Sequence, residues 1–509
     1  TPYKDGKGDI VRELSDACKK YGIKFAVYLS PWDRHQANYG SPEYVEYFYK
    51  QLNELLTNYG DVFEIWFDGA NGGDGWYGRA KDSRTIDRKT YYNYPRAYKM
   101  IDELQPQAVI FSDGGPGCRW MGNEHGFAGA TNWSFLRTGE VYPGYPKYRE
   151  LQYGHADGNQ WVAAECDVSI RPGWFYHPEE DDRVKTVDEL TDLYYRSVGH
   201  NATLLLNCPV DRDGLIHPTD SANAVNFHQN VQKQLAHNLL AGLSPKASDE
   251  RGRTFSAKAV TDGDYDTYWA TNDDVTSATI EFDLPQAEKI NRMMLQEYIP
   301  LGQRVKSFVV QYNQAGEWIP VKLNEETTTI GYKRLLRFET ITTDKIRIRF
   351  TDSRACLCIN NIEGYYAGET SDTYTAKATE LKSYPFTLVG VDVEEAQKGM
   401  DKNDQTTCFI NGNTLLIDLG EERTITSFHY LPDQSEYNKG LIAAYEISVG
   451  MDSNAVNQVV AKDEFSNIKS NPIMQSVYFT PVKARYIQLK ATRMIHDGEP
   501  MGLAEIGIK

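Results

Sequence analysis

Two carboxylates in the first half of the chain stand where catalytic groups are expected. Asp68 ends the apolar, aromatic-rich run "EIWFDG", and Gly69 frees the backbone to turn away from it. Glu124 lies in the glycine-rich segment "WMGNEHGFAGATNW", between Trp120 and Trp133. Aromatic neighbours desolvate a carboxyl group and raise its pKa, which is what a general acid requires.

Together, these two side chains have the chemistry of a glycosidase. One carboxylate attacks the anomeric carbon of a sugar while the other protonates the leaving oxygen. Retention of configuration needs the two carboxyls about 5 to 5.5 Å apart, and inversion needs about 6.5 to 9.5 Å. Each residue also has a structural alternative, because Asp68 could cap an Asx turn and Glu124 could be a solvated loop residue.

Other polar residues that follow predicted strands carry a weaker signal. Glu165 and Asp167 in "AAECDVS" could line a pocket or could be hydrogen-bonded strand-end structure. His35 in "SPWDRH" is expected to border the site, although a lone histidine near a strand end is more often structural. Asp74 in "GGDGWYG" is expected in a turn, with Trp76 as a platform for the group attached to the sugar.

The residues described above must be positioned by secondary structure. Residues 1–240 are expected to alternate between helices and short apolar strands. The helical stripe of "DIVRELSDACKKYG" is expected to end at Gly22. Five strands are expected, in "IKFAVYLS", "VFEIWFDG", "AVIFSDGG", "QWVAAECDVS" and "ATLLLNCPV". Repeated βα units predict a parallel sheet, and the lack of GxGxxG after the first strand argues against a dinucleotide fold. We therefore predict an α/β barrel with its site at the carboxyl ends of the strands.

The rest of the chain is predicted to be all-β. Residues 241–370 hold short alternating runs such as "ATIEFDL" and "KIRIRFT", which are typical of an antiparallel β-sandwich. Residues 371–509 repeat the plan with "TLLIDLG" and "ARYIQLKAT". The two segments share landmarks in the same order, so we interpret them as a duplicated domain.

Composition narrows the class of partner. The 509 residues include 54 Lys+Arg and 71 Asp+Glu, and the net charge of −17 disfavours nucleic acids and anionic membranes. Aromatic residues make up 12% of the chain, which suits stacking on neutral sugars. We expect no membrane span because no run of 18 apolar residues occurs. The seven cysteines contain no CxxC pair and are expected to be free thiols.

Several blocks closely resemble the α-L-fucosidases of glycoside hydrolase family 29. They are "GKGDIVRELSDACKKYGIKFAVYLSPWD", "EIWFDGA", "WMGNEHGFAG", "SIRPGWFYH" and "YYRSVGHNATLLLNCP", in the order of the family, over roughly residues 1–235. The resemblance implies a retaining exo-fucosidase with Asp68 as nucleophile and Glu124 as acid/base, and no cofactor for catalysis. It also implies Tyr28, Trp66 and Trp174 as pocket residues.

The "GNE" block resembles the branch of the family that removes α-1,3 and α-1,4 linked fucose, so a fucosylated oligosaccharide or glycoconjugate is the expected substrate. Family members carry a "KHHDGF"-like strand before the segment that here reads "TPYKDGKGD". The chain therefore looks like an N-terminally truncated barrel. Two alternatives stay open: a glycan-binding or adhesion protein with a degenerate barrel, and a retaining glycosidase for another sugar.

The two C-terminal segments resemble coagulation factor 5/8 type C (discoidin-like) domains. The first does so through "DGDYDTYWAT" and "INNIEGYYA", and the second through "KARYIQLKATR" and "LAEIGIK". Such domains often hold a structural calcium ion, for which Asp262, Asp264, Thr267 and Glu363 supply oxygen groups, with a plain turn as the alternative. By resemblance, a periplasmic or extracellular location is expected.

Overall fold

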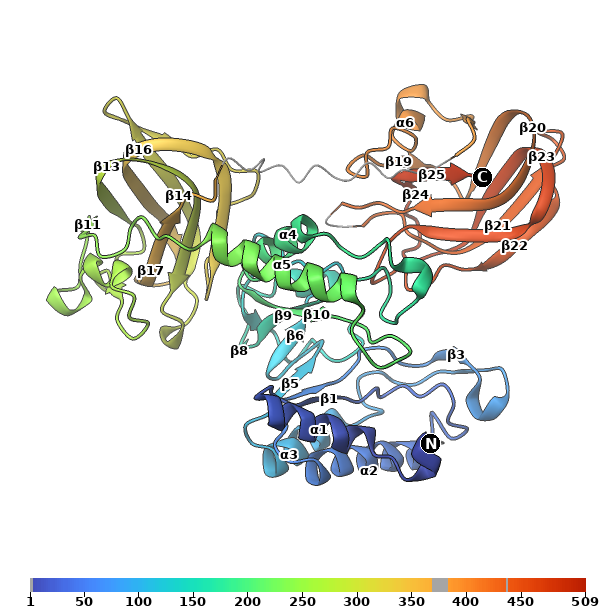
Figure 1. Ribbon diagram of the computed structural model, residues 1–509, viewed down its shortest axis with the longest axis horizontal. Coiled ribbons are helices and arrows are strands. Elements are labelled where there is room, and N and C mark those ends of the chain that lie inside the picture. The colour runs from blue at the N-terminus through green and yellow to red at the C-terminus, as the bar shows by residue number, and fades with distance from the viewer. Residues whose placement is uncertain (1–2, 369–382, 436–437) are drawn as a thin grey trace. The chain divides into compact units, whose positions relative to one another are not determined.

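The chain forms two compact units, Thr1–Asp372 and Thr373–Lys509. The computed structural model describes residues 3–368, 383–435 and 438–509 (Figure 1). The first unit contains a parallel sheet with its helices and also an antiparallel domain. The α/β plus all-β fold class is therefore confirmed, whereas the boundary expected at residues 240/241 stays a prediction.

The first unit begins with a six-stranded parallel sheet in which each strand lies beside its predecessor in the chain. A doubly wound sheet would reverse its strand order partway, so this order is that of a barrel wall. A complete TIM barrel has eight strands. The strands are β1 (Ala26–Tyr28), β2 (Glu64–Trp66), β5 (Val109–Ser112), β6 (Cys118–Trp120), β9 (Ala163–Ser169) and β10 (Ala202–Asn207).

The strand that the sequence did not predict is β6, so the expectation of five strands was wrong. Only three residues long, it has Arg119 at its centre. The Arg119 guanidinium is fully buried and donates to the carbonyls of Leu151 and Val162 and to the side chain of Asn132. A short strand around a charged residue has no apolar run to reveal it.

Five helices accompany this sheet. The first starts where the Asp9 carboxylate accepts from the amide of Arg12, and it ends at Gly22 in the left-handed region (φ 69°), as predicted. Figure 1 shows α1, α2 and α3 together beside β1 and β5, and α4 and α5 beside β9 and β10. The helices are α1 (Ile10–Tyr21), α2 (Pro42–Asn58), α3 (Tyr94–Leu104), α4 (Val187–Ser197) and α5 (Pro218–Gln234).

Alternation along the strands separates core residues from site residues. Ile65 and Phe67 are fully buried and belong to a core that includes Phe48 and Leu52 of α2. Trp66 and Asp68 therefore face the opposite side of the sheet. Two short antiparallel pairs lie outside the sheet: β3 (Gly73–Gly75) with β4 (Asp82–Arg84), and β7 (Phe135–Leu136) with β8 (Gln160–Trp161).

The first unit ends in an antiparallel sheet of order β12-β17-β13-β16-β14-β15, with β11 paired to β13. Its two longest strands, β13 and β16, have 20 residues each and shift register between Asp283 and Glu288. The strands are β11 (Lys246–Ala247), β12 (Trp269–Ala270), β13 (Ala278–Glu297), β14 (Val305–Gln314), β15 (Glu317–Pro320), β16 (Arg334–Ser353) and β17 (Cys358–Tyr365).

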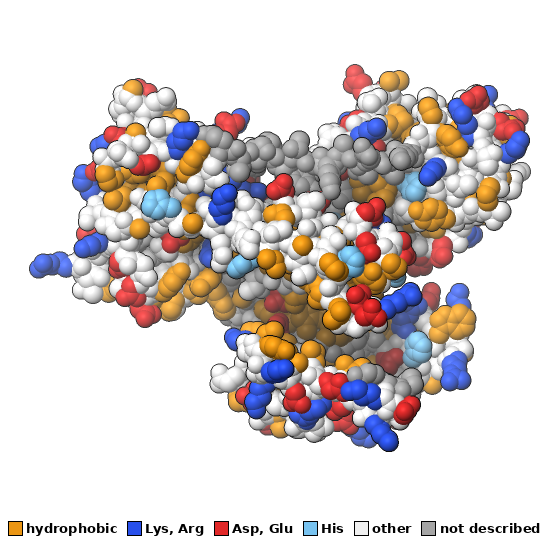
Figure 2. Space-filling view, in the orientation of Figure 1, with side chains coloured by type: hydrophobic (Ala, Val, Ile, Leu, Met, Phe, Trp, Pro, Cys, Tyr) orange, Lys and Arg blue, Asp and Glu red, His pale blue; other side chains and the backbone are white. Residues whose placement is uncertain are grey.

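The second unit repeats the long-strand plan, with β20 and β23 in the places of β13 and β16. Figure 2 shows acidic and basic side chains mixed over the visible face of the protein. The elements are β18 (Thr387–Val389), α6 (Val393–Gln397), β19 (Cys408–Ile410), β20 (Thr414–Leu431), β21 (Ile442–Gly450), β22 (Gln458–Glu464), β23 (Gln475–Met494), β24 (Met501–Leu503) and β25 (Glu505–Ile508). Within the described ranges, every helix is too short or too polar to cross a membrane.

Candidate active site

An aromatic layer crosses the carboxyl ends of β1, β2 and β5. The strand register sets Tyr28 beside Trp66 and Trp66 beside Phe111. The Tyr28 and Trp66 rings stack with centroids 5.3 Å apart, and those of Trp66 and Phe111 with centroids 4.1 Å apart. Tyr28 is 56% exposed, so the layer is open to a ligand at that end.

Asp68 lies directly above this layer and is half-buried. Its Oδ2 accepts a 2.6 Å hydrogen bond from the Tyr28 hydroxyl, and its Oδ1 accepts a 2.7 Å bond from the Ala70 amide. The Ala70 contact is that of an Asx turn. The two interpretations of Asp68 are therefore compatible, because one oxygen closes the turn while the other faces the aromatic layer.

The glycine after Asp68 is required by packing. A Cβ atom at Gly69 would lie 2.5 Å from Oδ2 of Asp113, the buried aspartate that follows β5. Asp113 in turn accepts a 2.7 Å bond from the Gly144 amide. The absence of a side chain at Gly69 lets the ends of β2 and β5 approach each other closely.

Glu124 is half-buried in the loop that follows β6. Its Oε2 accepts a 2.8 Å hydrogen bond from the indole nitrogen of Trp174. Neighbouring Asn123 shapes the loop, since its side chain donates to the Phe127 carbonyl (3.0 Å) and accepts from the His125 amide (3.0 Å). The glutamate therefore stands on an ordered turn with a fixed hydrogen-bond donor.

Both Asp68 and Glu124 affect the pKa of the Tyr28 hydroxyl. Burial around the hydroxyl, the charge of Asp68 and the hydrogen bond to Asp68 raise its pKa far above the ordinary value, and the charge of Glu124 adds to the rise. The phenol consequently stays protonated and remains a donor to Asp68. Asp68 and Glu124 act on one group, as two carboxylates at a single site would.

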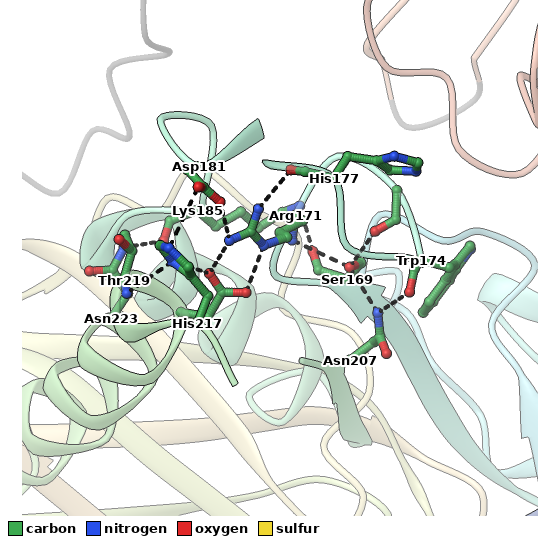
Figure 3. Close-up of polar contacts among 12 residues, drawn as sticks. Ser169, Arg171, Trp174, His177, Asp181, Lys185, Asn207, His217, Thr219 and Asn223 are labelled. Carbon is green, nitrogen blue, oxygen red and sulfur yellow. Dashed lines mark hydrogen bonds and ion pairs between the residues drawn. The ribbon is translucent and has the colours of Figure 1, made fainter. Parts of the chain in front are cut away.

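The loop that carries Trp174 is tied to the ends of β9 and β10 (Figure 3). Asn207 donates to the Trp174 carbonyl (3.1 Å) and to the Ser169 hydroxyl (3.0 Å), and Ser169 donates to the Gly173 carbonyl (2.7 Å). Asn207 and Ser169 are supporting residues to which the sequence assigned no partner.

Behind that loop lies a buried ion pair. Both Arg171 and Asp220 are fully buried, and the guanidinium meets both carboxylate oxygens at 2.8 Å. Asp181 approaches the same guanidinium at 2.9 Å from the charge run "PEEDDR". Part of that run is therefore engaged with the loop.

Two acidic residues, Glu165 and Glu64, lie close to the aromatic layer. Glu165 is buried, and its two oxygens accept from Trp66 (3.4 Å) and Thr203 (3.3 Å). Burial and the nearby Glu64 raise the pKa of Glu165 to about 7. Glu64, Cys118 and Glu165 have ligand atoms within 4.8 Å of one another. Burial likewise raises the pKa of Glu64 and that of the Cys118 thiol, so protonated groups are favoured here.

Asp167, on β9, is a third acid of this region. It is buried and accepts a 2.8 Å bond from the indole of Trp120, at the end of β6. Burial raises its pKa well above the ordinary range, and the charge of Glu124 contributes to the rise. Asp167 is therefore a buried, hydrogen-bonded residue of β9, and a place in the lining of a pocket stays a prediction.

His35 lies on the loop between β1 and α2, and it is exposed. Its amide donates to Asp33 (2.8 Å) and its carbonyl accepts from the Gly78 amide (3.1 Å). These contacts hold the loop through the main chain of His35 and do not use its imidazole ring. A substrate contact by His35 stays a prediction.

The residues expected to bind calcium do not form one ligand set. Asp262 accepts from the Asp264 amide (2.9 Å) and from the Thr267 hydroxyl (2.8 Å), which makes a closed turn. Glu363, on β17, instead accepts from Asn361 (3.0 Å) and from Tyr365. Calcium needs six to eight converging oxygens. Asp262 and Glu363 instead bond to neighbouring residues, and a calcium site stays a prediction.

Carboxylates on loops at the carboxyl ends of a barrel-like parallel sheet, above an open aromatic layer, are the arrangement expected in a glycoside hydrolase. The α-L-fucosidase family profile matches residues 3–229. An α-L-fucosidase 1 from Arabidopsis thaliana is 40% identical over 347 residues, which cover 66% of this chain and 64% of the relative. The chain thus spans slightly less than two thirds of that relative's length.

Solved structures agree with the family profile. A glycoside hydrolase 29 family member from an unknown rumen bacterium is 38% identical and has a TM-score of 0.64, covering 100% of this chain and 83% of that one. A glycoside hydrolase 29 fucosidase from Ruminococcus gnavus, solved in complex with fucose, is 30% identical with a TM-score of 0.62, covering 72% of this chain and 76% of that one. The chain belongs to glycoside hydrolase family 29, the α-L-fucosidases.

The C-terminal segments belong to a second family. The F5/8 type C domain profile matches residues 244–361 and 396–506. The first match falls on the sheet of β11 to β17 and the second on the sheet of the second unit. The interpretation of these segments as two discoidin-like domains is confirmed.

Proposed function

We propose that the protein is a retaining exo-α-L-fucosidase in which Asp68 is the nucleophile and Glu124 the acid/base. The observation that carries this proposal is that both carboxylates lie on loops at the carboxyl ends of the parallel sheet, where Asp68 is bonded to Tyr28 and Glu124 to Trp174. Membership of the family, and the R. gnavus relative solved with fucose, support fucose as the sugar.

In the first half of the reaction, Asp68 attacks the anomeric carbon as the bond to the leaving oxygen breaks, and the Glu124 proton passes to that oxygen. In the second half, Glu124 removes a proton from water, which displaces Asp68 from the sugar. Tyr28 keeps its proton throughout and fixes one oxygen of the nucleophile. The Trp174 indole holds Glu124 by its Oε2.

Replacement of each carboxylate by alanine tests these roles separately. We expect Asp68→Ala to lower kcat on an aryl fucoside at least about 10³-fold, as loss of a nucleophile does elsewhere. Added azide should restore turnover with opposite stereochemistry in the two variants, giving β-fucosyl azide from Asp68→Ala and α-fucosyl azide from Glu124→Ala. Asp74→Ala, at an exposed aspartate on β3, is the control.

Activity of Asp68→Ala close to that of the wild type would contradict the proposal and favour a glycan-binding protein. Turnover of galactosides in place of fucosides would favour a glycosidase for another sugar. Either result is obtained from the same panel of purified proteins.

The linkage preference is a finer part of the proposal. We infer cleavage of terminal α-1,3 and α-1,4 linked fucose from the "GNE" block, in which Asn123 orders the turn around Glu124. Release of fucose from Lewis-type trisaccharides should exceed release from an α-1,2 linked fucoside. Equal or faster cleavage of the α-1,2 linkage would contradict this assignment.

We also infer that the enzyme is exported from the cell. Glycan substrates and discoidin-like domains suit a periplasmic or extracellular enzyme. Fractionation of the producing cells, with the activity followed in each fraction, would test it.

A further inference from the structure

The loop that bears Glu124 continues into a polar seam with the first sandwich domain. We define the seam as the contacts of residues 128–134 and 200–201 with residues 303 and 325–334. It lies within the first compact unit, and its members are buried or half-buried except Glu326 and Tyr332, which are exposed. It begins four residues after Glu124.

Side chains of the sandwich satisfy main-chain groups of the loop. The Asn132 amide donates to Thr329 Oγ1 (2.8 Å), and the Asn132 carbonyl accepts from Gln303 Nε2 (2.8 Å). Gln303 Oε1 also accepts from the Ser134 amide (2.8 Å), and the Arg334 guanidinium donates to the Ala130 carbonyl. Buried main-chain groups need such partners, so the loop obtains its hydrogen bonds from another domain.

Three ionisable side chains, those of Arg334, Glu325 and His200, form the centre of the seam. Arg334, which is 1% exposed, meets Glu325 at 2.8 Å, and Glu325 meets His200 Nε2 at 2.7 Å. His200 Nδ1 faces the Ala128 carbonyl at 2.9 Å and must donate to it. Burial alone would raise the pKa of Glu325, but the His200 bond and the Arg334 charge lower it to about 2.

Further bonds hold the segment between Asn123 and the seam. The Asn123 side chain donates to the Phe127 carbonyl, and the Ala128 amide donates to the Arg196 carbonyl (2.8 Å). The main chain between Phe127 and Ser134 is thus held by hydrogen bonds at Phe127, Ala128, Ala130, Asn132 and Ser134. Directional polar contacts fix one arrangement, which apolar packing alone does less well.

We propose that the first sandwich domain is part of the catalytic apparatus, in which Arg334, Thr329 and Gln303 are positioning residues for the loop that carries Glu124. This inference rests on the acid/base role proposed for Glu124. A displaced acid loses most with leaving groups that need protonation, such as sugar hydroxyls. It loses least with nitrophenols, which leave without help.

Thr329→Val tests the proposal with minimal change in shape. We expect it to lower kcat/KM about tenfold on a fucosyl disaccharide, as small misplacements of catalytic groups do, and less than about twofold on a nitrophenyl fucoside. The control is Thr343→Val in the same domain. Thr343 is equally buried (3% against 2% exposed), but its bonds to Asn313 and Lys345 stay inside the sandwich.

Arg334→Lys is the second variant, because it keeps the positive charge but loses the planar fork that joins Ala130 to Glu325. We expect the same selective loss on the disaccharide. Equal losses on both substrates in both seam variants, or the same pattern in Thr343→Val, would overturn the proposal.

Glu124→Gln separates this inference from the proposed function. A selective loss in Glu124→Gln without one in Thr329→Val or Arg334→Lys overturns the positioning role alone. No selective loss in Glu124→Gln overturns the acid/base role of Glu124 and this inference with it.

Discussion

Asp68 combines a structural contact with the catalytic role proposed for it. Its contact with the Ala70 amide holds the turn, which orients the other oxygen toward Tyr28. A lone aspartate after a strand is ambiguous from sequence because both roles use the same residue type in the same place. Its tyrosine partner, 40 residues away in the chain, is what distinguishes it.

Tyr28→Phe is predicted to weaken catalysis without unfolding the protein. The change removes one hydroxyl from a side chain that is 56% exposed, while ring stacking on Trp66 is kept. A hydrogen bond to a charged group contributes about 1.5 to 3 kcal/mol, so kcat/KM should fall roughly 10- to 100-fold. Steady-state kinetics on an aryl fucoside measure the change, with the unfolding temperature as control. An unchanged kcat/KM would exclude a role for this contact.

Glu165→Gln is predicted to change how stability depends on pH. Folding raises the pKa of Glu165 from 4.5 to about 7, so the folded state favours the protonated acid. The resulting stabilisation is complete below about pH 4.5 and is lost as the pH rises through 7, up to roughly 3 kcal/mol at 1.4 kcal/mol per unit. Glutamine cannot ionise, so the variant should lose less stability between pH 5 and pH 8.

Thermal unfolding at both pH values measures that difference. Glu179→Gln, at an exposed glutamate, is the matched control and should follow the wild type. An identical pH dependence in Glu165→Gln and the wild type would mean that Glu165 does not titrate in this range.

At the level of elements, the sequence predicted those whose pattern is local. The helix that ends at Gly22 is predictable because the apolar stripe and the capping glycine are adjacent in the chain. The β6 strand was not predictable, because the partners of Arg119 lie up to 43 residues away. The predicted strand "QWVAAECDVS" is in fact two, β8 and β9, which pair with different neighbours.

The turn before Glu124 gives an element-scale prediction. Gly122 has φ 75°, and a Cβ atom there would lie 2.1 Å from the Tyr148 carbonyl oxygen. Gly122→Ala should therefore lower the free energy of unfolding by more than about 1 to 2 kcal/mol. The backbone conformation alone accounts for that amount, and the steric clash adds to it. We expect a lower unfolding temperature and a weaker activity.

Gly139→Ala is the control, since a Cβ atom at Gly139 meets no neighbour within 4 Å. Similar stabilities of the two alanine variants would show that the loop carrying Glu124 adapts more freely than its contacts indicate.

At the scale of the whole molecule, the described contacts around the proposed site all lie in the first unit, Thr1–Asp372. The family blocks pointed to the barrel and to the two sandwich domains separately. They carried no sign that Thr329 and Arg334 bond to the loop that carries Glu124, because those contacts join residues about 200 positions apart. Long-range hydrogen bonds leave no periodic pattern in a sequence.

Truncated proteins test whether activity depends on the first unit alone. A protein that ends at residue 372 is expected to keep kcat/KM on a small aryl fucoside within about twofold, because the second unit supplies none of the described site contacts. A protein that ends at residue 240 should lose activity along with the seam. Loss of activity in the longer truncation product would show that the second unit contributes to catalysis or to folding.

The most direct test of the central claim is to trap the intermediate. A 2-deoxy-2-fluoro-fucosyl fluoride slows the second half of a retaining reaction, so that the sugar stays bound to the nucleophile. Peptide mass spectrometry of the labelled protein is predicted to locate the fluorofucosyl group on Asp68. A label on another carboxylate, or release of the inverted sugar with no labelled peptide, would contradict the account.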